Sequence, residues 1–135
     1  MRRFFNLILV LSVLSLSQSI FAYNPQIQVC ENKSGSFFVA RSQNDEIGFC
    51  RFGQAFIGAL DILHLTQEHQ ITQAVQEYKS GTTSCQGDEA TLTTPEGDEI
   101  QVCQFTDYSF ISLNTLKAGL DNSINKKLNK ALRLN

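Results

Sequence analysis

Four cysteines constrain the fold of this 135-residue chain more than any other feature. They occur as two widely spaced pairs, Cys30 with Cys50 and Cys85 with Cys103. Cysteines that bind zinc usually come in close pairs such as Cys-x-x-Cys, so these spacings disfavour a metal site. An even number of cysteines in a small exported chain favours disulfide bonds instead. Four cysteines allow three pairings, and a repeated segment of the sequence selects one of them.

The repeated segment has the pattern Asp-Glu-Ile-x-x-Cys-x-Phe, which occurs at residues 45–52 and again at residues 98–105. Two leucines follow each copy at unchanged offsets from its cysteine: Leu60 and Leu63, then Leu113 and Leu116. This self-similarity indicates an internal duplication. A duplication predicts one disulfide bond within each copy. The predicted bonds are Cys30–Cys50 and Cys85–Cys103.

The first 22 residues have the three-part layout of a secretory signal peptide. Arg2 and Arg3 supply a positive start, residues 4–16 are almost wholly apolar, and Ala22 is a small residue before the expected cut. An apolar helix of that length spans about 20 Å, which is short of the roughly 30 Å hydrocarbon core of a bilayer. We therefore predict cleavage after residues 1–22 and export to the periplasm or the cell exterior.

The mature part has the pattern of an α+β domain. Each copy has a β-prone stretch, a polar turn and a second β-prone stretch: residues 37–41 and 47–52, then 91–93 and 100–105. After each hairpin the apolar spacing changes to the period of a helix. The expected helical stripes are Phe56/Leu60/Leu63, Ile71/Ala74/Val75/Tyr78, Leu113/Leu116/Leu120 and Ile124/Leu128/Leu132. We predict two tandem hairpin-plus-helices repeats, residues 23–81 and 82–135, in one domain whose helices cover one face of an antiparallel sheet.

Several residues of the first copy also occur together in a known family: Asn24-Pro25, Cys30, Gly35, the stretch 37–41 and Gly48-x-Cys50-x-Phe52. Residues 24–53 thus resemble a small family of exported bacterial domains of unknown function, often given a haemolysin label. Residues 85–116 are a degraded second copy, which lacks the Asn-Pro pair. Members of the family usually add a cysteine pair and an acidic segment with tryptophan, and residues 54–63 contain neither. The resemblance implies an envelope or secreted location and no established activity.

Asp61, His64 and Glu68 are the strongest candidates for catalysis. Their spacing places them on one face of an unbroken helix, where a carboxylate and an imidazole can act as acid and base or share a metal ion. In the second copy, Asn114 and Lys117 stand at the positions that match Asp61 and His64. We therefore favour a solvated helix end here and predict no enzyme activity, metal or cofactor. A small hydrolase is the less favoured alternative.

Charge is distributed unevenly along the chain. Residues 23–116 contain 4 basic and 12 acidic side chains, whereas residues 117–135 contain 5 basic and 1 acidic. Four of the basic residues lie beside the last apolar stripe: Lys126, Lys127, Lys130 and Arg133. They form either an arm for weak contact with an anionic membrane or partner, or the outer face of a helix docked on the acidic body. We favour the docked helix, since the repeat predicts an equivalent helix at residues 70–78.

The net charge of −2 lacks the basic excess that is typical of nucleic-acid binders. The leading hypothesis is a non-enzymatic, disulfide-bonded binding module of the envelope or exterior. Its hairpin loops would contact an unknown protein, peptide or glycan. A peptidase inhibitor is an alternative of the same kind, because a small bridged scaffold holds its loops rigidly and so lowers the cost of binding.

Overall fold

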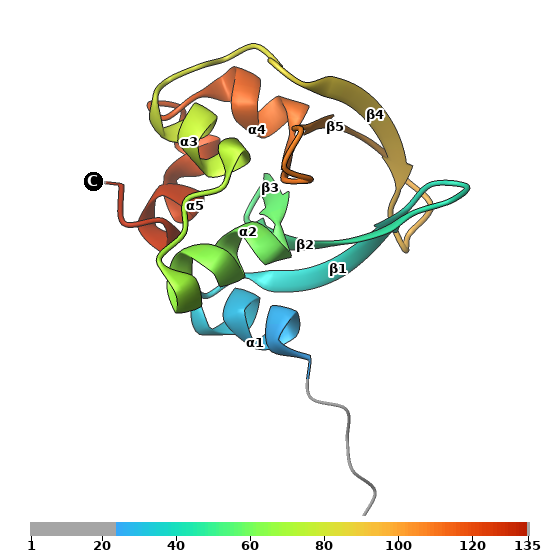
Figure 1. Ribbon diagram of the computed structural model, residues 1–135, viewed down its shortest axis with the longest axis horizontal. Helices are drawn as coiled ribbons and strands as arrows, with labels where there is room; N and C mark the ends of the chain where they lie inside the picture. The colour runs from blue at the N-terminus through green and yellow to red at the C-terminus, as the bar shows by residue number, and fades with distance from the viewer. Residues whose placement is uncertain (1–23, 135) are drawn as a thin grey trace, which may run out of the picture.

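The computed structural model describes residues 24–134, so the predicted signal peptide lies outside the described residues. Six antiparallel strands form a closed barrel in the order β1-β2-β3-β6-β5-β4 (Figure 1). The strands are β1 (Ser36–Arg41), β2 (Glu46–Phe52), β3 (Ala55–Gly58), β4 (Asp88–Thr93), β5 (Glu99–Gln104) and β6 (Phe110–Ser112). The predicted α+β class and both predicted hairpins are therefore confirmed. The predicted antiparallel sheet with helices over one face does not include its closure into a barrel, which occurs because β3 meets β6 and β1 meets β4.

Short helices gather on one side of the barrel, away from the tips of the β1–β2 and β4–β5 hairpins (Figure 1). The α-helices are α1 (Pro25–Asn32), α2 (Ala59–Leu63), α3 (Gln73–Lys79), α4 (Leu113–Ala118) and α5 (Lys126–Ala131). Two irregular turns complete the set, the π-helical η1 (His64–Glu68) and the 3₁₀ helix η2 (Ser123–Asn125).

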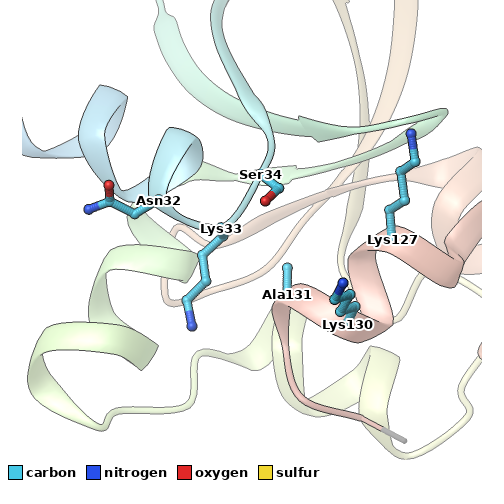
Figure 2. A pocket seen from close by; sticks show the side chains of 6 residues that line it. All are labelled: Asn32, Lys33, Ser34, Lys127, Lys130 and Ala131. Carbon is cyan, nitrogen blue, oxygen red and sulfur yellow. The ribbon is translucent and has the colours of Figure 1, made fainter.

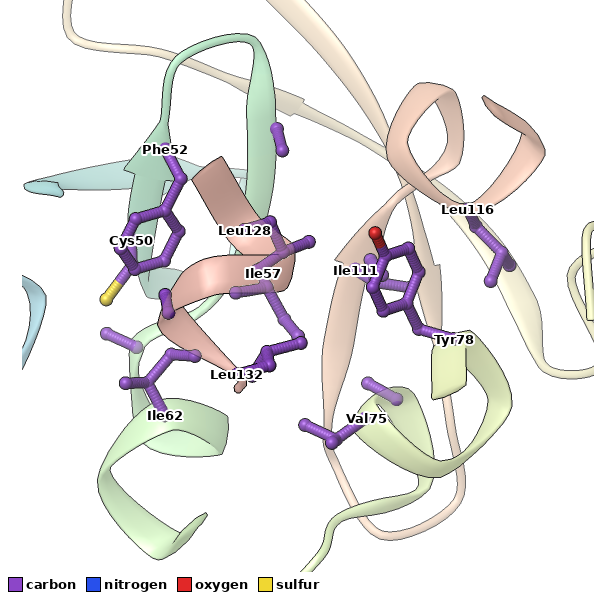
Figure 3. Close-up of a cluster of buried hydrophobic side chains, with 14 of the residues drawn as sticks. Cys50, Phe52, Ile57, Ile62, Val75, Tyr78, Ile111, Leu116, Leu128 and Leu132 are labelled. Carbon is purple, nitrogen blue, oxygen red and sulfur yellow. The ribbon is translucent and has the colours of Figure 1, made fainter. Parts of the chain in front are cut away.

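Alternate side chains of a strand point to opposite sides, so the barrel contributes to two cores. One face forms a small core inside the barrel, in which the Phe38 and Phe49 rings lie 5.5 Å apart and Phe110 meets Phe49 edge-on. The other face packs under the helices in a larger core (Figure 3). Fully buried members of the larger core include Cys50, Phe52, Ile57, Ile62, Val75, Tyr78, Ile111, Leu116 and Leu128.

The first predicted helical stripe is wrong. Phe56 belongs to β3, and Leu60 is 49% exposed, whereas Ile62 is buried on α2. In the second stripe Ile71 is also exposed, because α3 begins only at Gln73. Strands as short as β3 and β6 show no clear period of two, so the sequence pattern does not reveal them.

The C-terminal stripe, in contrast, is docked as expected. Leu128 and Leu132 are buried, and α5 is tied to its surroundings by buried amide groups. The Asn125 side chain donates to the carbonyls of Thr115 and Gly119 at 2.9 and 2.8 Å. The Tyr78 hydroxyl donates to the side chain of Asn129. The last helix is therefore part of the folded body.

The structure has both disulfide bonds of the predicted pairing. Cys30–Cys50 joins α1 to β2, and Cys85–Cys103 joins the segment before β4 to β5. Disulfides of this kind are typical of proteins in an oxidising environment outside the cytoplasm.

The two halves of the barrel have the same order of elements, three antiparallel strands followed by a helix. They meet at Ile57 of β3 and Ile111 of β6, which are directly paired. Reciprocal hydrogen bonds reinforce this junction. The Thr115 hydroxyl on α4 accepts from the Phe56 N–H at 3.0 Å, and Asp61 on α2 accepts from the Phe110 N–H at 3.1 Å. Each half thus supplies a side chain that binds the short strand of the other.

Candidate functional site

The three candidate catalytic residues do not form one site. His64 and Glu68 pair at the surface, with 2.6 Å between Nδ1 and Oε2. Asp61 is 2% exposed and accepts its hydrogen bond from β6 instead. The π-helical turn η1 begins at His64, and its wider turn breaks the face that an unbroken α-helix would present.

Asp61 lies in an environment that disfavours its charge. Burial raises its pKa from 3.8 to about 7, and the nearby charge of Asp107 acts in the same direction. The Thr72 side chain, the Phe110 N–H and His64 oppose that shift. Gly58 makes the position possible, because a side chain there would collide with the Asp61 carboxylate. The contacts of Asp61 indicate a role in joining the two halves.

The raised pKa of Asp61 predicts a pH-dependent stability. Folded protein keeps a proton on Asp61 between pH 4 and 7 that the unfolded chain releases, so the free energy of unfolding should fall as pH rises. The expected slope from this group is about 1 kcal/mol per pH unit. Asp61→Asn keeps an acceptor for the Phe110 N–H but does not titrate, and should remove this slope. Urea unfolding across this pH range measures it.

The matched control for that experiment is Glu96→Gln, because Glu96 is an exposed carboxylate in the turn of the β4–β5 hairpin and belongs to neither ion pair of the described residues. It should leave the slope as in the unmodified protein. If Asp61→Asn and the unmodified protein have the same slope, Asp61 does not hold a proton in the folded state.

Residues 24–134 contain no cluster of three or more His, Cys, Asp or Glu side chains that could hold a metal ion. Over the same residues, no helix has both the length and the apolar character that crossing a membrane requires.

A pocket between the end of α1 and the outer face of α5 is lined by three lysines. It has a volume of about 380 Å³, and Lys33 lines it from α1 while Lys127 and Lys130 line it from α5 (Figure 2). Asn32, Ser34 and Ala131 complete the lining, so no acidic side chain belongs to it. We call this the lysine pocket. The C-terminal lysines were predicted as a cluster, but Lys33 was not.

The end of α1 is held firmly, which fixes the backbone that carries Lys33. Asn24 caps the start of the helix by accepting from the Gln26 N–H, and Lys33 is the C-cap. The N–H groups of Lys33 and Gly35 both donate to the Cys30 carbonyl, at 3.2 and 2.8 Å. Cys30 is in turn bonded to β2. The disulfide therefore anchors this side of the lysine pocket.

The three lysines of the pocket are not neutralised by the protein. The ion pairs among the described residues are Arg41–Glu46 and His64–Glu68, so no carboxylate of residues 24–134 lies within 4.0 Å of these ammonium groups. Cationic groups that line one concave surface attract anions, which can accept charge-assisted hydrogen bonds from them. The arrangement is chemically suited to hold a carboxylate, phosphate or sulfate group.

The basic surface continues on both sides of the lysine pocket. A hollow of about 270 Å³ shares Lys33 and Ala131 with it and adds His69 and Arg133. Another of about 310 Å³ shares Lys127 and adds Lys126. The predicted basic residues of the C-terminal segment thus surround one region of the surface.

Comparison of the chain with models of protein families, with curated proteins and with solved structures finds no match.

Proposed function

We propose that this protein is an exported, non-enzymatic binding module that takes an anionic group of its ligand in the lysine pocket. The observation that carries the proposal is that Lys33, Lys127 and Lys130 line one pocket without an acidic side chain. The rigid attachment of both walls supports it, since a pre-organised site loses little conformational entropy on binding.

The proposed location rests on the disulfides and on the N-terminal sequence. Two disulfide bonds form and persist in an oxidising compartment. Residues 1–22 have the layout of a cleavable signal peptide. A periplasmic or extracellular module would meet anionic groups there on surface polymers, lipids and proteins.

We also propose that the two halves derive from one duplicated unit. Ile57 and Ile111, which pair directly, are 54 positions apart, and so are the partners Phe56 with Phe110 and Asp61 with Thr115. Cys103 precedes Ile111 by one residue more than Cys50 precedes Ile57. Because of this extra residue, the leucines that match in the sequence repeat differ by one position from the residues that match in the structure.

Binding of a compact polyanion tests the proposed site. We expect inositol hexaphosphate to bind the oxidised, exported protein at low salt, and more weakly at high salt because the attraction is screened. The double variant Lys33→Gln/Lys130→Gln should bind it roughly ten-fold or more weakly, because two charge-assisted hydrogen bonds are lost. Isothermal titration calorimetry measures both affinities.

The matched control removes the same number of charges elsewhere. Lys79→Gln/Lys117→Gln alters two exposed lysines that do not line the lysine pocket. The affinity of this variant should fall by less than a factor of about two, because only the long-range electrostatic attraction changes. Equal losses in the two double variants, or no binding by the unmodified protein, would refute the proposed site.

A further inference from the structure

We infer that the ligand is a linear acidic oligosaccharide, which runs from the lysine pocket to a second, mixed hollow at Arg51. This inference rests on the proposed function and specifies the class of ligand. Its basis is a continuous row of three hollows on the described surface. The lysine pocket shares Lys127 with a middle hollow of about 310 Å³. The middle hollow shares Gly53, Gln54 and Ile124 with a hollow of about 570 Å³ that Arg51 lines.

Lys127 and Gly53 lie side by side where the lysine pocket adjoins the middle hollow. Gly53 forms the tight turn between β2 and β3 with a φ of +65°, and a Cβ atom there would lie 3.5 Å from the Lys127 side chain. The turn therefore lies directly beside the wall of the lysine pocket. An extended ligand can follow this path, whereas a single small anion would occupy only one end.

Arg51 gives the far end a fixed cation. Its guanidinium carbon lies 4.8 Å from the centre of the Phe38 ring and 4.9 Å from that of Phe56. Such cation–π contacts hold the planar group in place without neutralising it. No carboxylate among residues 24–134 pairs with Arg51, and its buried Nε makes no hydrogen bond. A second anionic or polar group of the ligand would therefore meet a positioned guanidinium that has no carboxylate partner among these residues.

The rest of the far hollow favours hydroxyl groups. Gln54 and Asn114 supply amides, Asp98 supplies a carboxylate, and Phe56 and Ile124 supply apolar surface. Amides and carboxylates are suitable partners for hydroxyls, and Asp98 repels a ligand that is charged at every unit. A polymer with both hydroxyl-bearing rings and spaced acidic groups satisfies both ends of the row. An acidic oligosaccharide has this chemistry.

Two other classes of ligand fit less well. An extended peptide that adds to a sheet needs an unpaired strand edge; β1 and β4 pair with each other only at Arg41 and Thr93, and the rest of these two edges does not line the row of hollows. A membrane surface needs exposed apolar groups next to the lysines. The exposed large apolar side chains among residues 24–134 are Ile27, Leu60, Ile71 and Tyr108, and none of them lines the row of hollows.

The test separates the far hollow from the lysine pocket with two probes. The double variant Gln54→Ala/Asn114→Ala removes two exposed amides of the far hollow. We expect it to bind a tetrasaccharide in which uronic acids alternate with neutral sugars roughly five-fold more weakly, and to bind inositol hexaphosphate as the unmodified protein does. The double variant Lys33→Gln/Lys130→Gln should weaken the binding of both ligands. A neutral hexose tetrasaccharide should bind at least ten-fold more weakly than the acidic one.

The matched control is Gln76→Ala/Gln101→Ala, which removes two exposed amides outside the row of hollows. It should leave both affinities unchanged. If hexaphosphate binds but the tetrasaccharide does not respond to Gln54→Ala/Asn114→Ala, the oligosaccharide inference is wrong and the proposed function stands. If vesicles of phosphatidylglycerol and phosphatidylcholine bind more tightly than the tetrasaccharide, a membrane is the ligand instead. Failure of both soluble probes would refute the lysine pocket itself.

Discussion

Removing the Cys30–Cys50 bond with paired alanines should destabilise the protein more than removing Cys85–Cys103. The two loops are nearly equal in length, with separations of 20 and 18 residues, so the chain-entropy part is similar. That part is worth about 3 kcal/mol for each bond. Cys30 and Cys50 are both fully buried, whereas Cys85 is only partly buried, so the first substitution also leaves the larger void in the core. Such a void adds on the order of 1 kcal/mol.

Urea unfolding of the two alanine pairs measures this difference. The Cys30–Cys50 variant should also bind inositol hexaphosphate more weakly, because the bond anchors the end of α1 that carries Lys33. The Cys85–Cys103 variant is the control, as its bond lies in the other half and should not affect that binding. The reverse order of stabilities would show that the first bond does not have the greater structural role.

Shortening the side chains where the halves meet should have the second large effect. Ile57 and Ile111 are paired across β3 and β6 and are both fully buried. Ile57→Ala and Ile111→Ala should each lower the free energy of unfolding by about 2–5 kcal/mol. The free energy of unfolding of a small domain is only about 5–15 kcal/mol in total, so the double variant should be largely unfolded. Circular dichroism and urea unfolding measure the change.

Leu60→Ala is the control at this junction. Leu60 lies next to β3 on α2, and the sequence pattern predicts it as a core residue, yet it is 49% exposed. Its truncation should cost within about 0.5 kcal/mol. If Leu60→Ala lowers the free energy of unfolding as much as Ile57→Ala does, Leu60 belongs to a buried helical stripe. That result would support an open sheet and contradict the closed barrel.

The local parts of the fold are predictable from the sequence. The hairpins have strong β-prone stretches and polar turns, and the repeat selects the cysteine pairing that the structure has. Closure of the barrel is not predictable in this way. It depends on contacts such as Arg41 with Thr93, which are distant in the sequence and leave no local pattern. The turn at residues 106–108 also shifts the second half by one position, so the sequence pattern does not show that Ile62 corresponds to Leu116.

The candidate site is predictable only in part, for a similar reason. The basic residues of α5 form a visible cluster in the sequence, and their helix docks by Leu128 and Leu132 as expected. Lys33 lies far from the other lysines in the sequence, so only the packing of α1 against its neighbours places it in the same pocket as Lys127. For Asp61 the period of an α-helix is misleading, because the chain changes to a π-helical turn at His64.

Nuclear magnetic resonance titration of the labelled, oxidised protein with inositol hexaphosphate locates the bound anion residue by residue. We expect the largest chemical-shift changes at the amides of Lys33 and Ser34 and of residues 127–131, on the two walls of the lysine pocket. Changes centred on the hairpin turns at 42–45 and 94–98, or on His64 and Glu68, would contradict the proposed site.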